Sequence, residues 1–354
     1  MHRPITPKFV LRQIKADLIG KDSYRGITLT YAWMANQFGH FSLGFIPTVA
    51  GVILFNGWYP DRDNAFWAPI FLSLFWLFFE TYNFLGPLFS KNRSRSKVLF
   101  LKGPKYVFQP SWGNVAFDTI TDLLFFWLGA FSASLLFAHR ESYLVLLAII
   151  VILLVYPISY WFLTKMYLQI PQYPFQFRLS QWDVENLNGA VLKKIRMFLQ
   201  SPAGGKHLLI FGTEKSGKTS LGVGIATELS IRHRTCVYLT AIKLYALFFR
   251  SESQTTLPWD WRNSSLLVID DINPGNPVKP DLVTPVQFLK LIDTYKDKNE
   301  QNRERLRTAN AIWLLGSSDI TDGTGENWED LLREIGVRSE DILTIHMPEM
   351  PDSR

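Results

Sequence analysis

The feature that most constrains this chain is a run of 21 residues without a charged side chain, Tyr143–Leu163. A helix of that length spans the ~30 Å hydrocarbon core of a bilayer. Three further stretches, 27–59, 65–89 and 123–138, contain between them one acidic side chain, Glu80, and one histidine, His40. We therefore predict an N-terminal all-α transmembrane domain rather than an unusually apolar soluble core. Its four helices are expected near residues 38–58, 66–88, 117–138 and 143–164.

Lysine and arginine residues gather in two parts of this half, the arm before Ile27 and the segment 90–110, with six in each. The other two connections between the predicted helices hold one each. Positively charged loops stay on the cytoplasmic side of a membrane. We therefore predict a multi-pass protein of the inner (cytoplasmic) membrane, with both termini in the cytoplasm.

The net charge of +6 lies entirely in the first half of the chain. Residues 1–164 hold 14 basic and 8 acidic side chains, whereas residues 165–354 hold 23 of each. Binding to nucleic acid depends on an excess of positive charge, which the second half does not have. Nucleic acid is therefore not an expected partner.

Four ionisable residues interrupt the predicted membrane helices: His40, Glu80, Asp118 and Asp122. Such side chains are costly inside a bilayer and need a structural or functional reason. The spacing of Asp118 and Asp122 places them on one face of a helix. Two interpretations remain open. The four residues either pair helices or lie at the membrane interface, or they form an intramembrane polar site for a ligand, an ion or a lipid headgroup.

The same residues carry a resemblance. GHFSLGF (39–45), Glu80 and DTITD (118–122) resemble the pattern of VanZ-type small membrane proteins. Those proteins place a His in one helix, a Glu in the next and two Asp at the start of another. The Asn that usually follows the aspartates is absent here, and the resemblance implies no particular activity.

The second half contains a phosphate-binding motif. The octapeptide GTEKSGKT (212–219) matches G-x-x-x-x-G-K-S/T, between a short apolar run, His207–Phe211, and an amphipathic run, Leu221–Ile231. In this context backbone N–H groups converge on phosphate oxygens. Lys218 is expected to reach the β- and γ-phosphates, and the Thr219 hydroxyl to bind Mg²⁺. The predicted nucleotide-binding residues are Gly212, Thr213, Glu214, Lys215, Ser216, Gly217, Lys218, Thr219 and Ser220.

A second apolar run, Leu266–Ile269, ends in two acidic residues. We predict that Asp270 binds Mg²⁺ and that Asp271 activates the attacking water, as acids at the end of such a strand do in P-loop enzymes. Further strands are expected at 235–240, 311–315 and 342–345. Ser317 and Asp319 follow the strand at 311–315, where they either sense the γ-phosphate or cap a turn.

The segments HLLIFGTEKSGKTSL, VYLTAIKLYALF, SLLVIDDI and IWLLGSSD, in that order, resemble AAA+ ATPases of the DnaA/DnaC/IstB kind. The resemblance implies a parallel five-stranded sheet and ATP hydrolysis coupled to oligomerisation, often in service of a partner protein. The family's arginine finger falls near Ile335 here, between Arg333 and Arg338, which become the candidate fingers in trans. The chain ends at Arg354 without room for a helical lid, so slow or partner-activated hydrolysis is expected.

The sequence thus predicts two parts: four transmembrane helices and an α/β P-loop NTPase. The leading hypothesis is a membrane-anchored, oligomeric ATPase or ATP-dependent switch that uses ATP and Mg²⁺ and acts on a partner protein. The alternatives are an ATP-gated pore or lipid-binding effector, of use in defence, and a membrane scaffold that binds ATP without hydrolysis. The expected segments are a basic arm (1–30), the helical domain (31–164), a linker and helix (165–205) and the ATPase domain (206–354).

Overall fold

The computed structural model divides into two compact units, residues 1–165 and 166–354. It describes residues 7, 30, 32–89, 105–108, 111–184, 187–200, 204–249, 258–272, 284–294, 299–316 and 324–348.

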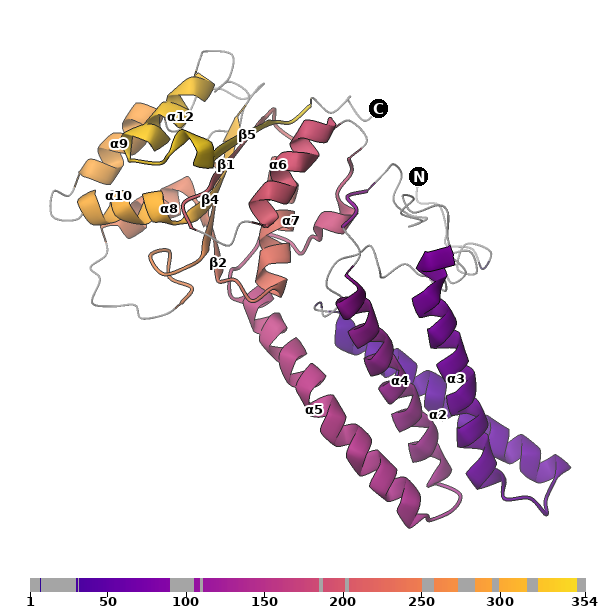
Figure 1. Ribbon diagram of the computed structural model, residues 1–354. Helices are drawn as coiled ribbons and strands as arrows, with labels where there is room; N and C mark the ends of the chain where they lie inside the picture. The colour runs from indigo at the N-terminus through magenta and orange to yellow at the C-terminus, as the bar shows by residue number, and fades with distance from the viewer. Residues whose placement is uncertain are drawn as a thin grey trace. The chain divides into compact units, whose positions relative to one another are not determined.

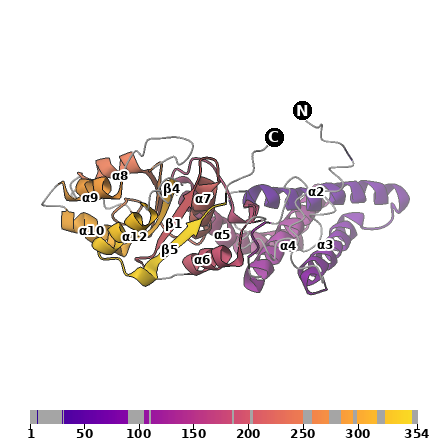
Figure 2. The same cartoon turned by 90° about the horizontal axis from the view of Figure 1, so that it is seen from above.

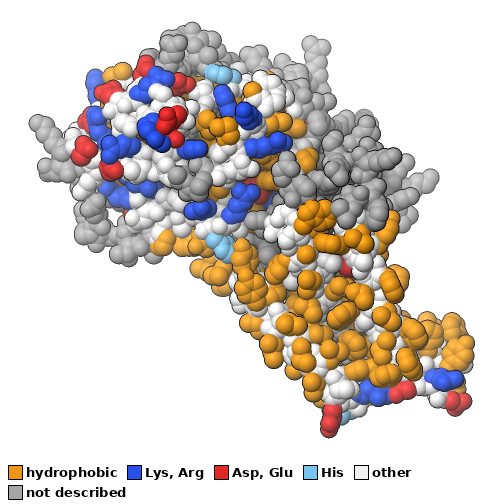
Figure 3. Space-filling model, viewed as in Figure 1, with side chains coloured by type: hydrophobic (Ala, Val, Ile, Leu, Met, Phe, Trp, Pro, Cys, Tyr) orange, Lys and Arg blue, Asp and Glu red, His pale blue; other side chains and the backbone are white. Residues whose placement is uncertain are grey.

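The first unit contains four long helices, as predicted (Figure 1). Each is long and apolar enough to cross a membrane. Hydrophobic side chains cover the face of these helices that Figure 3 displays. The last of the four helices ends at Gln169, five residues beyond its predicted end at 164. The bounds are α2 Trp33–Trp58, α3 Asn64–Phe89, α4 Trp112–Ser134 and α5 Glu141–Gln169.

Two glycines allow α2 and α4 to approach closely. A Cβ atom added to Gly44 would lie 2.0 Å from the carbonyl oxygen of Phe126, and one added to Gly129 would lie 2.1 Å from that of Phe41. Small residues at such crossings let helix backbones pack directly against each other. The pairing of α2 with α4 therefore depends on the absence of side chains at these two positions.

The second unit is built on a parallel sheet with the strand order β2-β3-β4-β1-β5. This confirms the predicted five-stranded parallel sheet. The strands are short and apolar because both faces of the sheet are covered by helices. Their bounds are β1 His207–Gly212, β2 Cys236–Thr240, β3 Leu266–Asp270, β4 Asn310–Gly316 and β5 Ile342–His346.

Helices lie on both sides of this sheet (Figures 1 and 2). Helices α6 and α7 cover one face, and α8, α9, α10 and α12 lie on the other. Their bounds are α6 Gly189–Leu199, α7 Lys218–Ile231, α8 Ala241–Phe248, α9 Pro285–Asp293, α10 Asn299–Thr308 and α12 Thr324–Glu334.

Large aromatic side chains fill the core on the second face. The ring of Phe288 lies 5.4 Å from that of Trp313 and 5.9 Å from that of Trp328, measured between centroids. All three side chains are buried. Aromatic residues bury large apolar areas, so α9 and α12 are held to the central strand β4 by these contacts.

The segment expected as a linker packs against α7, the helix that follows the phosphate loop. The 3₁₀ turn Leu179–Gln181 lies beside it, with Leu179 fully buried. Arg178 donates two hydrogen bonds, of 2.6 and 3.1 Å, to the buried carboxylate of Glu228. The hydroxyls of Tyr173 and Ser230 lie 2.9 Å apart. The chain that leaves α5 is therefore joined to α7 by an ion pair, a hydrogen bond and apolar packing.

Candidate functional site

The phosphate loop connects β1 to α7 and follows a path that needs glycine at two points. A Cβ atom on Gly212 would lie 2.5 Å from Ser216 Oγ and 2.9 Å from Met347 Cβ. Gly217 has a φ of +86° in the left-handed region, which costs glycine little. Lys215 also has a positive φ, of +64°. The loop is therefore tightly closed over the carboxyl end of β1.

Lys218 begins α7 and points back into the loop. Its Nζ donates hydrogen bonds of 2.7 Å to the carbonyl oxygens of both Gly212 and Thr213. Gly217 precedes the helix and has no side chain, so it provides no side-chain cap for the first N–H groups of α7. An ammonium group beside an uncapped helix N-terminus is an arrangement that favours a phosphate group.

Asp270 ends β3 and accepts three hydrogen bonds. Its Oδ2 accepts from Thr219 Oγ1 at 2.9 Å and from the hydroxyl of Tyr238 at 2.6 Å. Its Oδ1 accepts from the backbone N–H of Asp271 at 2.8 Å. A carboxylate and a hydroxyl in contact beside a phosphate loop are the oxygen ligands that Mg²⁺ prefers. Thr219 and Asp270 thus fit the predicted metal site.

Tyr238 is a residue of this site that the sequence analysis missed. It lies on β2 opposite Val268, so it is diagonal to Asp270 on the same face of the sheet. Burial, and then the hydrogen bond and negative charge of Asp270, raise the pKa of the Tyr238 hydroxyl far above its usual value. The hydroxyl therefore keeps its proton and acts as the donor. The only signal in the sequence is a tyrosine two residues before the end of a strand.

Asp271 lies just beyond β3, with an exposed side chain and a left-handed φ of +54°. Partial desolvation, and then the neighbouring charge of Asp270, raise the pKa of its carboxyl. A non-glycine residue held at positive φ is uncommon and often marks a functional position.

Of the remaining predicted loop residues, Glu214 and Lys215 have exposed side chains, whereas Ser216 is buried. Lys215 is 88% exposed and lies 4.0 Å from Glu214. These positions can therefore serve a bound phosphate through their backbone N–H groups. Ser317 and Asp319, the predicted sensor residues, lie outside the described residues, and β4 is described up to Gly316.

The two candidate arginine fingers are bound to acidic residues of their own chain. Arg333 contacts Asp330 at 2.6 Å and Glu329 at 2.9 Å, all on α12. Arg338 contacts Asp341 at 2.7 Å and is 71% exposed. Either guanidinium would have to leave these partners in order to reach a phosphate.

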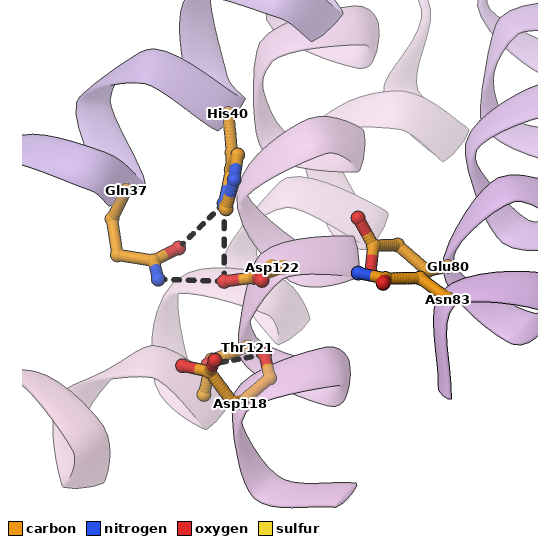
Figure 4. A network of polar contacts seen from close by, with 7 residues as sticks. All are labelled: Gln37, His40, Glu80, Asn83, Asp118, Thr121 and Asp122. Atoms are coloured by element: carbon orange, nitrogen blue, oxygen red, sulfur yellow. Dashed lines mark hydrogen bonds and ion pairs between the residues drawn. The ribbon is translucent and has the colours of Figure 1, made fainter. Parts of the chain in front are cut away.

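In the first unit, two of the four predicted polar residues come together (Figure 4). His40 Nδ1 on α2 lies 3.0 Å from Asp122 Oδ1 on α4. Gln37, which the sequence analysis missed, donates to the same oxygen at 2.6 Å and is buried. This contact joins the two helices that cross at the paired glycines.

The other two residues contact different partners in Figure 4. Glu80 on α3 accepts a hydrogen bond from Asn83 at 3.4 Å, and the backbone oxygen of Asp118 accepts one from Thr121 at 2.8 Å. Within the described residues, no group of three or more His, Cys, Asp or Glu side chains is arranged to hold a metal ion. The contact of His40 and Gln37 with Asp122 joins two helices, whereas these hydrogen bonds of Glu80 and Asp118 each lie within one helix.

Together, the sheet, the loop and the Thr219–Asp270 contact define the second unit as an α/β P-loop fold, preceded by four apolar helices. No family model and no curated protein matches the chain. The resemblance of the first half to VanZ-type proteins gains no support from these comparisons.

Solved structures with a similar fold cover about half of the chain. They include DnaI (17% identity, 54% of this chain and 93% of that chain, TM-score 0.33). They also include the DnaC helicase loader (17% identity, 52% and 99%, TM-score 0.32). A third is a putative primosome component from Streptococcus pyogenes serotype M3 (18% identity, 50% and 88%, TM-score 0.31).

Proposed function

We propose that this protein is a membrane-anchored ATPase that works as an ATP-dependent switch on the cytoplasmic side of the inner membrane. The observation that carries the proposal is the 2.9 Å contact between Thr219 Oγ1 and Asp270 Oδ2, beside a loop that encloses the Lys218 ammonium. These three side chains come from two points of the chain, the start of α7 and the end of β3, and converge where a nucleoside triphosphate with its metal ion would bind.

The residues have distinct roles in this proposal. Backbone N–H groups of residues 213–219 hold the phosphates, and Lys218 exchanges its two carbonyl partners for phosphate oxygens. Thr219 and Asp270 hold Mg²⁺, which when bound neutralises charge that develops on the phosphates. Asp271 accepts a proton from the attacking water.

The orientation in the membrane rests on charge. The short α2–α3 and α4–α5 connections lie at the same end of the first unit, since Arg140 pairs with Asp63 there. The arm, the α3–α4 connection and the second unit then belong to the opposite, cytoplasmic side, where twelve of the basic residues of the first half are found.

Hydrolysis in this proposal depends on a second copy or a partner protein. Arg333 and Arg338 lie on the surface and have acidic partners within their own chain. An interface with another copy would offer the phosphate as an alternative partner for one of them. An isolated copy would then hydrolyse ATP slowly.

The test is nucleotide binding and turnover by the purified full-length protein in detergent. Replacing Lys218 removes charge-assisted hydrogen bonds worth about 1.5–3 kcal/mol, so Lys218→Ala is expected to weaken ATP binding roughly 10- to 150-fold. Lys193, an exposed lysine on α6, provides the matched control Lys193→Ala. Unchanged ATP affinity in Lys218→Ala, or no binding by the natural protein, would contradict the proposal.

A second candidate is an effector role for the helical unit, such as a pore or lipid-binding module controlled by ATP. The observation in its favour is the His40–Asp122 pair with Gln37, a polar contact between otherwise apolar helices. ATP-dependent leakage from vesicles that contain the protein would support this role. Vesicles that stay sealed with and without ATP would exclude the pore.

A further inference from the structure

The carboxylate of Asp270 is held in one orientation by donors from three elements. Thr219 belongs to α7, Tyr238 to β2 and the N–H of Asp271 to the chain after β3. A carboxylate has about four acceptor positions, so these bonds leave one for a metal ion or a metal-bound water. Because Thr219 and Tyr238 share Oδ2, the remaining position belongs to Oδ1.

Tyr238 differs from Thr219, the other side-chain donor, in its relation to the phosphate loop. It lies on a strand beside β3 and is not part of the loop or its helix. Its 2.6 Å bond to Asp270 Oδ2 has the length typical of a hydroxyl that donates to a carboxylate, and it is shorter than the 2.9 Å bond from Thr219 to the same oxygen. The strand pairing of β2 with β3 therefore fixes the donor before any ligand arrives.

We propose that Tyr238 is a positioning residue for the metal ion of the nucleotide site. Its hydroxyl orients the Asp270 carboxylate, so the affinity for Mg²⁺ depends on residue 238 although Tyr238 touches neither the metal nor the nucleotide. This inference rests on the proposed function, because it requires that nucleotide and metal bind at Thr219 and Asp270.

The substitution that isolates this role is Tyr238→Phe, which removes the donor and keeps the ring in place. Loss of a residue that orients a metal ligand typically weakens metal binding 10- to 100-fold. Binding of the nucleotide without metal uses the loop amides and Lys218, whose ammonium donates to Gly212 and Thr213, whereas the Tyr238 hydroxyl donates to Asp270. Tyr238→Phe should therefore weaken the binding of Mg²⁺ but leave the binding of nucleotide without metal nearly unchanged.

The experiment measures binding of a fluorescent ATP analogue to the full-length protein in detergent, first in EDTA and then during a titration with Mg²⁺. For Tyr238→Phe we expect affinity in EDTA within about twofold of the natural protein, and a half-saturating Mg²⁺ concentration at least 10-fold higher. Tyr245→Phe is the matched control, since Tyr245 lies on α8 with its ring edge-on to Phe249. It should match the natural protein in both conditions.

Two results would overturn the inference. An unchanged Mg²⁺ midpoint in Tyr238→Phe would show that the hydroxyl does not position the metal ligand. An equal loss of affinity in EDTA and in Mg²⁺ would show that Tyr238 only supports the fold. Failure of the natural protein to bind the analogue in either condition is a different result, which would refute the proposed function itself.

Discussion

Thr219 Oγ1 donates a hydrogen bond of 2.9 Å to Asp270 Oδ2, and this contact joins the first turn of α7 to the last residue of β3. The two residues are 51 positions apart in the chain. They meet because β3 lies beside β4, which pairs with β1, so the carboxyl ends of the parallel strands lie at one edge of the sheet. Ligands of open parallel sheets bind at this edge.

Removing the Thr219 hydroxyl should weaken the binding of Mg²⁺ but not the binding of phosphate by the loop. Thr219→Val keeps the shape of the side chain but offers no oxygen to Mg²⁺. We expect the gain in ATP affinity that Mg²⁺ provides to fall at least tenfold, whereas Thr219→Ser should retain it. Calorimetric titration with ATP, with and without Mg²⁺, measures this gain. Equal gains in the Val and Ser variants would contradict the assignment.

Asp271 is predicted to affect turnover rather than binding. Asp271→Asn cannot accept a proton, and general bases contribute about 10²- to 10⁴-fold to rates. We expect hydrolysis of ATP to fall by that factor while ATP affinity stays within about threefold. Phosphate release and equilibrium binding, measured on the same preparation, check both. Turnover at the natural rate would remove Asp271 from the mechanism.

The ion pair between Arg178 and Glu228 should stabilise the second unit. Glu228 has a side chain that is 1% exposed, so Arg178→Ala leaves a buried charge without its partner. Such a change typically costs about 3–5 kcal/mol. The double variant Arg178→Met with Glu228→Leu removes both charges, and its free energy of unfolding should fall much less. Denaturant unfolding of the three proteins gives the comparison, and equal losses for the single and double variants would contradict it.

His207 should make the stability of the second unit depend on pH. Burial lowers the pKa of His207 to about 4 from its ordinary 6.5, and Trp313 Nε1 donates to its Nδ1 at 3.0 Å. The folded protein therefore binds the proton less readily than the unfolded chain. The contribution of the buried, neutral His207 to the free energy of unfolding is complete above pH 6.5. It is lost as pH falls from 6.5 towards 4, by about 2 kcal/mol between pH 7 and pH 5.

His207→Asn tests this pH dependence, because the amide oxygen can accept from Trp313 but does not titrate. Its free energy of unfolding should change less between pH 7 and pH 5, by about the same 2 kcal/mol. Denaturant unfolding at the two pH values gives the difference. A variant with the same pH dependence as the natural protein would assign the effect to other groups.

The crossing of α2 and α4 should be sensitive to a single methyl group. Gly44→Ala places a Cβ against the Phe126 carbonyl, and overpacking of this kind costs about 1–3 kcal/mol. Gly39 lies on the same helix with nothing within 4 Å of an added Cβ, so Gly39→Ala is the control. Thermal unfolding in detergent should show a lower midpoint for Gly44→Ala alone. Equal midpoints would contradict the observed crossing.

Local patterns in the sequence were sufficient for much of the architecture. The uncharged run Tyr143–Leu163 predicted a membrane-length helix because hydrophobicity and length are properties of consecutive residues. The octapeptide at 212–219 predicted the phosphate loop for the same reason, since its shape depends on glycines at set positions within one turn of chain. The parallel five-stranded sheet was implied by the resemblance of four segments to AAA+ ATPases.

By itself, then, the sequence determined the four apolar helices, the phosphate loop and the acidic end of β3. Only the tertiary structure decided that Tyr238 reaches Asp270, that Gln37 joins His40 at Asp122, and that Arg178 neutralises Glu228. The physical reason is distance along the chain. A hydrogen-bond partner 32, 85 or 50 residues away is selected by which strands and helices become neighbours, and that choice depends on packing of the whole unit rather than on any local pattern.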